Sequence, residues 1–169
     1  CVFCAIAALC IFLSSNYDRE KRRYLILMES FASLLLLMDA MAHIFSGYPG
    51  VPGNVMVRIS SFLVFLLSDV VLLCFHIYVC VYLFSKRERR TLKRVKAGYV
   101  IAAAGVAFVV ISQFTHWYYY IDGDNCYHRA PLYIMSILFS AAGLLIDLTL
   151  LLQYKKRVSR KLLFSMLSC

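Results

Sequence analysis

Apolar residues are gathered along this chain into long runs that short polar clusters separate. Five runs cover residues 1–13, 24–45, 55–85, 97–116 and 132–154, and a further run begins at residue 162. A helix that crosses a bilayer needs about 20 consecutive apolar residues. The first run is too short for that and the last has only begun. The pattern predicts an all-α membrane fold: a bundle of about five transmembrane helices, the first truncated and a further one just begun. We interpret residues 1–169 as a single transmembrane domain cut from a longer protein.

Composition excludes an ordinary soluble domain and charge predicts an orientation. The chain is 62% hydrophobic and 16% charged, whereas soluble domains are about half apolar and about a quarter charged. Sixteen of the 18 basic residues lie in three alternating linkers, at residues 16–23, 85–96 and 155–161, and the other two are Arg58 and Arg129. The positive-inside rule places such linkers in the cytoplasm. We therefore expect a multi-pass protein of the cell membrane, with the loops at 46–54 and 117–131 extracellular.

The net charge of +9 is explained by these linkers. Each basic run adjoins an apolar span, as expected for contact with anionic lipid headgroups. Basic and aromatic residues do not interleave on one surface, so we expect the lipid bilayer as a partner and no nucleic acid.

The loop at 117–131 has the pattern of a β-hairpin. Two aromatic, β-prone stretches flank Asp122-Gly123-Asp124-Asn125, which are residues typical of turns. Trp117 and the neighbouring tyrosines would lie at headgroup level. Two interpretations remain open: a lid over an outward-facing pocket, or a hairpin that only lies on the membrane surface.

Ionisable residues within the spans are candidates for function, because a charge in lipid costs at least about 2.5 kcal/mol. Asp39 and His43 are four residues apart and share one helix face, and Arg58 begins the next span. An Asp39–Arg58 ion pair beside His43 would form either an outward polar pocket for a small ligand or proton, or a structural clamp. The full set of such candidates is Glu29, Asp39, His43, Arg58, Asp69, His76 and Asp147.

Three further spans carry patterned faces. Asp69 and His76 are seven residues apart, and the fifth run has a polar stripe of Ser136, Ser140, Gly143 and Asp147. The fourth run has a small-residue face at Gly98, Ala102 and Gly105, which suits close helix packing. These polar residues either form hydrogen bonds between helices or mark an ion or proton path. No catalytic triad, phosphate loop or metal motif can be recognised, so we expect no enzyme activity, metal or cofactor in this segment.

A family resemblance rests on the outer loop and two spans. The run from Tyr118 to Arg129, Leu36-Leu37-Met38-Asp39-Ala40 and the stretch from Val57 to Phe65 resemble the N-terminal membrane input regions of Gram-positive, clostridia-type signalling proteins. In that family, cytoplasmic GGDEF diguanylate cyclase domains, sometimes with EAL domains, or histidine-kinase domains follow. The sequence departs from the pattern at Ser61, where the family favours Asn, and at Ala130, where it favours Gly.

The resemblance implies a sensor domain that relays an extracellular or intramembrane signal to an output domain beyond Cys169. The outward recognition set would be Asp39, His43, Arg58, Asp122, Asn125, Tyr127 and Arg129. Expected partners besides lipid are an unidentified small ligand and, as an option, a second copy of the chain. The alternatives are a small transporter or channel subunit that uses Asp69 or Asp147, and a structural membrane scaffold.

Overall fold

Helices make up most of the fold in the computed structural model, which describes residues 19–154. Four are long: α2 (Arg19–Phe45), α3 (Val51–Leu83), α5 (Lys93–Thr115) and α6 (Tyr133–Gln153). All four are long and apolar enough to cross a membrane by length and composition, and they coincide with the four central hydrophobic runs. The short first run, the linker at 155–161 and the run that begins at 162 lie outside the described residues.

The helix ends differ from the predicted boundaries for local reasons. Helix α2 begins at Arg19, inside the polar linker, and α3 begins at Val51, with Pro52 in its first turn. Proline suits that position because its missing N–H would have no helical partner there. The second basic linker is itself helical, as α4 (Lys86–Thr91). A capping box between Ser85 and Glu88 starts this helix.

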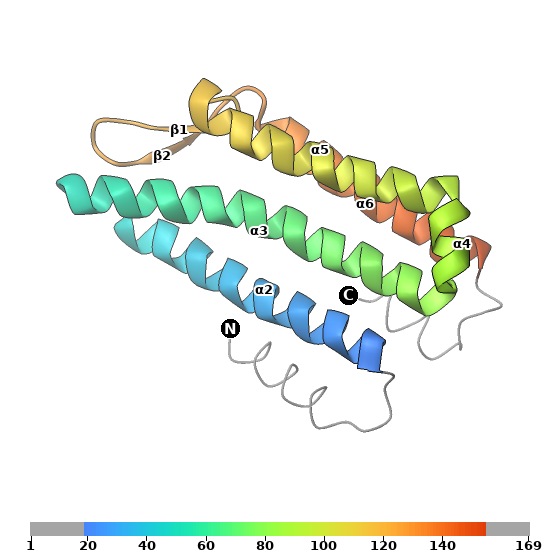
Figure 1. The fold of residues 1–169 in the computed structure, drawn as a ribbon. Coiled ribbons are helices and arrows are strands. Elements are labelled where there is room, and N and C mark those ends of the chain that lie inside the picture. Colours follow the sequence, from blue (N-terminus) through green and yellow to red (C-terminus); the bar gives the residue numbers. More distant parts are fainter. Residues whose placement is uncertain (1–18, 155–169) are drawn as a thin grey trace.

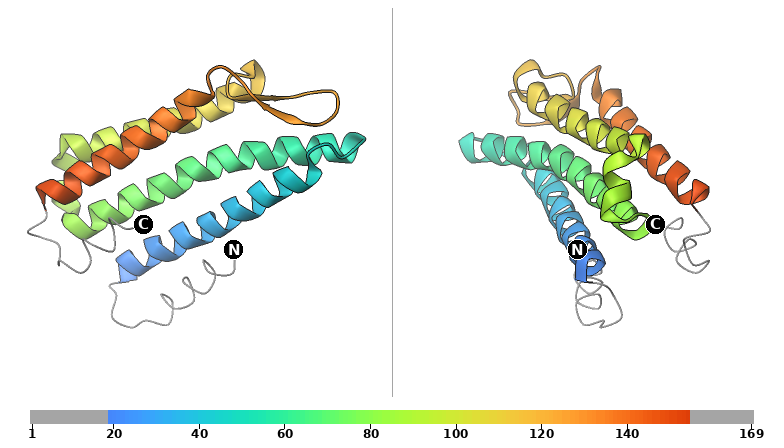
Figure 2. Two further views of the ribbon diagram at one scale, coloured as in Figure 1. Left: turned by 180° about the vertical axis from the view of Figure 1, so that it is seen from behind. Right: turned by 45° about the vertical axis from the view of Figure 1, so that its right-hand side comes forward.

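Helix α3 lies at the centre of the bundle. It runs between α2 on one side and the α5–α6 pair on the other (Figures 1 and 2), and it contacts all three of these helices. Consecutive long helices run antiparallel, so the start of α2, helix α4 and the end of α6 meet at one end of the molecule. We call this the basic end. The opposite end, which holds residues 46–50 and 116–131, is the hairpin end.

The predicted hairpin is present. Strand β1 (Tyr119–Ile121) pairs antiparallel with β2 (Tyr127–Arg129), and Tyr120 lies opposite His128. Asp122 closes the turn, since its side chain accepts hydrogen bonds from the backbone N–H groups of Asp124 and Cys126, at 3.0 and 2.8 Å. The hairpin lies beside the hairpin end of α3 (Figure 1).

The two ends of the bundle have different cores. At the basic end the core is mainly aliphatic, with Val79, Leu83, Val95, Leu150 and Leu151 buried together. At the hairpin end the core is aromatic: Val109, Tyr118 and Tyr119 are buried there, and phenylalanines of α3 and α5 pack around them. Polar residues of α3 lie between these two cores.

Candidate functional site

A cavity of about 550 Å³ opens in the hairpin half of the bundle. Helix α3 supplies one wall, and α2, α6 and strand β2 supply others. Its lining residues are Asp39, Ala42 and His43 of α2; Ser46, which follows α2; Ser61, Val64, Phe65, Ser68 and Asp69 of α3; Val109 of α5; Tyr127 and Arg129 of β2; and Tyr133, Ser136, Ile137 and Ser140 of α6. The volume lies in the range of pockets that bind small molecules, about 300–1,000 Å³.

Charged side chains line this cavity at different depths. On α2, Asp39 and His43 are 3.9 Å apart and largely exposed. Arg129 is also exposed, and its guanidinium lies 4.8 Å above the ring of Tyr133. Asp69 is only 7% exposed. The cavity thus combines an exposed Asp–His contact, an exposed guanidinium and one buried acid.

Asp69 has no polar partner among the residues that the structure describes. It lines the cavity, yet it makes no hydrogen bond or ion pair with any residue from 19 to 154. Its carboxylate instead lies against the backbone of α5, where a Cβ on Gly105 would be 3.0 Å from Oδ2. Burying an uncompensated carboxylate is costly, so this residue is the most unusual feature of the cavity wall.

The neighbouring phenols remain protonated at neutral pH. Burial raises the pKa of Tyr118 to about 12, and the charge of Asp69 adds to this effect. The hydroxyl of Tyr118 is buried and has no hydrogen-bond partner within residues 19–154. Burial likewise raises the pKa of Tyr127 to about 12. Both side chains are therefore neutral donors beside the cavity.

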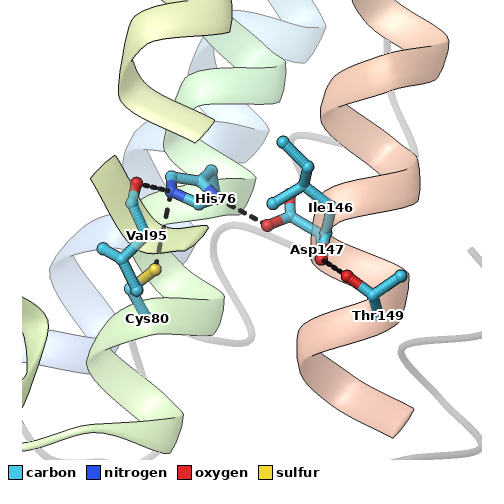
Figure 3. A network of polar contacts seen from close by, with 6 residues as sticks. All are labelled: His76, Cys80, Val95, Ile146, Asp147 and Thr149. Atoms are coloured by element: carbon cyan, nitrogen blue, oxygen red, sulfur yellow. Dashed lines mark hydrogen bonds and ion pairs between the residues drawn. The ribbon is translucent and has the colours of Figure 1, made fainter. Parts of the chain in front are cut away.

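Two turns after Asp69 on α3, both ring nitrogens of His76 have hydrogen-bond partners (Figure 3). Its Nδ1 lies 2.5 Å from Asp147 Oδ1 of α6, and its Nε2 lies 3.1 Å from the carbonyl oxygen of Val95 in α5. A carbonyl oxygen can only accept, so Nε2 carries a proton. The contact at Nδ1 is a hydrogen bond to the carboxyl group of Asp147. His76 therefore joins three helices, and Asp147 keeps only Oδ2 unpaired among the described residues.

Two glycines of α5 lie against Asp69 and His76 of α3. Gly105 faces Asp69, and a Cβ on Gly98 would overlap the ring of His76. On α6, a Cβ on Gly143 would be 2.7 Å from Leu72. The small-residue face and the polar stripe found in the sequence thus pack against α3, as small residues do in membrane helix pairs.

Asn125 holds the two loops of the hairpin end together. Its amide donates to the carbonyl oxygens of Tyr48 and Gly50, at 2.9 and 3.2 Å. Its Oδ1 accepts from Asn54 at 2.8 Å, and its backbone carbonyl accepts from Gly47 N–H at 3.1 Å. Asn125 adopts a positive φ of 60°, a conformation that Asn tolerates. This contact fixes β2, and with it Tyr127 and Arg129, beside the cavity.

The structure brings together only part of the predicted recognition set. Asp39, His43, Tyr127 and Arg129 line the cavity, whereas Asp122 and Asn125 hold the hairpin in place. The predicted Asp39–Arg58 ion pair does not form within the described residues. Arg58 lines a separate small cavity with Gln113 and Tyr119, because its helix position faces α5 and β1 rather than α2.

Among the remaining intramembrane candidates, Asp69 is in the cavity wall, while Glu29 is half-buried on α2 and lines no part of it. His76 and Asp147 lie nearer the basic end. Sequence reasoning did not find the contributions of Ser68 and Tyr133. Ser68 could have been found, since Ser61, Phe65 and Ser68 repeat at helical spacing.

The chain was compared with protein-family models, curated proteins and solved structures, and none of them matches. The candidate site therefore rests on the geometry alone. Within residues 19–154 no group of three His, Cys, Asp or Glu side chains could hold a metal ion.

Proposed function

We propose that this chain is a membrane-embedded input domain, in which a small polar molecule binds at the hairpin end and changes the activity of a cytoplasmic output domain. The observation that supports it is the cavity of about 550 Å³, in which four of the seven residues of the recognition set meet a buried acid. Strand β2 contributes Tyr127 and Arg129 to the wall, which favours the lid interpretation of the hairpin over a hairpin that only lies on the membrane.

The proposed relay runs through α3. This helix lines the cavity with Ser61, Ser68 and Asp69, and two turns later His76 joins it to α5 and α6. A ligand shifts such an equilibrium only if it has different affinities for the two packings. The ligand would draw the cavity walls together, and the rigid contact at His76 would carry the movement to the end of α6 that leads toward Cys169.

The experiment uses the full-length gene product and a variant that fills the cavity, Ser140→Phe. The control is Leu144→Phe, one turn further on α6, where the side chain is 51% exposed. Cells that carry each form are assayed for cyclic diguanylate and for protein phosphorylation, the outputs that the resemblance implies. We expect Ser140→Phe to fix the output at one level across growth conditions, while Leu144→Phe responds like the wild type. Equal responses of all three forms would refute the proposal.

A further inference from the structure

The chemistry of the cavity wall defines the class of ligand. Asp69 is 7% exposed, lines the cavity and has no polar partner in the described chain. A cation that comes within ion-pair distance offsets part of the free energy lost by burying this charge. At the wall of this cavity, the ligand is the natural source of that cation.

An aromatic wall stands beside this acid. Phe65, Tyr127 and Tyr133 all line the cavity, and Phe65 packs edge-on against Tyr133 at a centroid distance of 6.0 Å. Aromatic faces attract cations, and ammonium ligands are recognised by such rings. An inorganic cation would use the carboxylate but would leave the apolar part of the wall, including Val64 and Ile137, without a partner.

The exposed part of the cavity wall carries charged side chains of both signs. The exposed guanidinium of Arg129 lies over Tyr133, where it can pair with a carboxylate. The exposed Asp39 is already 3.9 Å from His43. A ligand that carries both an ammonium and a carboxylate group could therefore contact Asp69 and Arg129 together.

From this arrangement we infer that the cavity binds a small organic ammonium compound with an apolar body, whose positive charge pairs with Asp69 and whose body lies against Phe65, Tyr127 and Tyr133. The inference rests on the proposed function for its biological meaning, but binding itself needs no output domain. The ammonium group can come from a soluble amine, from an amino acid or from a lipid headgroup, and the experiment separates these sources.

The test measures thermal unfolding of the purified chain in nanodiscs of phosphatidylglycerol, a lipid without an ammonium group. The probes are phenethylamine, its neutral analogue 2-phenylethanol, and L-phenylalanine. We expect phenethylamine, and not 2-phenylethanol, to raise the melting temperature of the wild type. In Asp69→Asn the apparent Kd should rise at least about tenfold, because the buried charge partner is lost.

The matched control is Glu29→Gln, which removes an acid of α2 outside the cavity. It should bind phenethylamine as the wild type does. A larger shift with L-phenylalanine that Arg129→Ala abolishes assigns the carboxylate to Arg129, whereas binding of the amine alone leaves Asp69 as the charged contact. Equal shifts in the wild type and Asp69→Asn, or no shift with any probe, would overturn the inference.

A separate experiment tests whether a lipid headgroup supplies the ammonium group. If a headgroup supplies the ammonium, replacing part of the phosphatidylglycerol by phosphatidylethanolamine should stabilise the wild type and weaken phenethylamine binding, and Asp69→Asn should show neither change. The two proposals fail separately. Binding without any effect of Ser140→Phe on output would refute the sensor and keep the ammonium site, and the reverse result would refute only the ligand class.

Discussion

Asp69 and His76 lie seven residues apart on one face of α3, and each faces a glycine of α5, yet their surroundings are opposite. His76 has hydrogen-bond partners on α5 and α6, while Asp69 has none among the described residues and borders a cavity. The core toward the basic end, near His76, is mainly aliphatic, whereas the core near Asp69 is aromatic and borders the cavity. The same sequence feature, a polar residue on a helix face, thus joins three helices at one position and borders a cavity at the other.

The largest expected effect comes from removing the acid at the packed end. Asp147→Ala should lower the free energy of unfolding by about 2–4 kcal/mol, because it leaves the buried His76 without its ion-pair partner. Reversible unfolding in mixed micelles, followed by circular dichroism, measures it. The control is Thr149→Ala, whose exposed hydroxyl bonds only to its own helix. Equal losses in the two variants would show that His76–Asp147 contributes nothing specific.

The two glycines of α5 should respond differently to the same change. In Gly98→Ala the new methyl group meets a ring that two hydrogen bonds hold in place, so we expect a loss of about 1–3 kcal/mol. In Gly105→Ala the carboxylate of Asp69 can turn into the cavity, and alanine favours a helix by up to about 1 kcal/mol. The same unfolding experiment should give little or no loss for Gly105→Ala. A greater loss there than at Gly98 would contradict the comparison.

At the hairpin end, Asn125→Gly should lower the free energy of opening of the outer loops by about 1–2 kcal/mol. Glycine keeps the positive φ of this residue and removes only its side-chain hydrogen bonds to Tyr48, Gly50 and Asn54. Hydrogen exchange of residues 117–131 measures the effect, and protection should fall about tenfold. Asp124→Gly, at an exposed turn position, is the control and should leave protection unchanged.

Asp69→Asn should be stabilising by about 1 kcal/mol, because it removes a buried charge that has no partner. Asp147→Asn should instead destabilise, so the two equivalent changes have opposite signs. Melting temperatures in ligand-free nanodiscs of phosphatidylglycerol test this contrast. A lower melting temperature for Asp69→Asn would mean that its carboxylate already has a stabilising partner.

The smallest effect concerns pH and the hairpin turn. Hydrogen bonds from the backbone of Cys126, from His128 and from the backbone of Asp124 lower the pKa of Asp122 from its usual 3.8. A lowered pKa in the folded state contributes stability above the unfolded value, and this is lost as the pH falls through the folded value. The only tryptophan, Trp117, packs near Phe108 beside the hairpin. Its fluorescence should therefore change below pH 3.8 in the wild type and much less in Asp122→Asn.

The sequence by itself determined the elements that local physics controls. The length of the apolar runs predicts four helices that are long enough to span a membrane. The runs form helices because unpaired backbone groups are not tolerated in lipid. The residues Asp122 to Asn125 favour the turn, and the short connections between the runs make consecutive helices antiparallel neighbours. Helical spacing also placed Asp69 with His76, and Ser136 with Asp147, on shared faces.

Only the tertiary structure decided which of these residues meet. Periodicity gives a side chain's angle around its own helix but not the rotation of the neighbouring helix. For that reason Arg58, predicted to face Asp39, lies instead with Gln113 and Tyr119, and Asn125 joins two loops. For the same reason the sequence could not show that Asp147 of α6 would be paired with His76, while Asp69 of α3 would lie at the wall of a cavity.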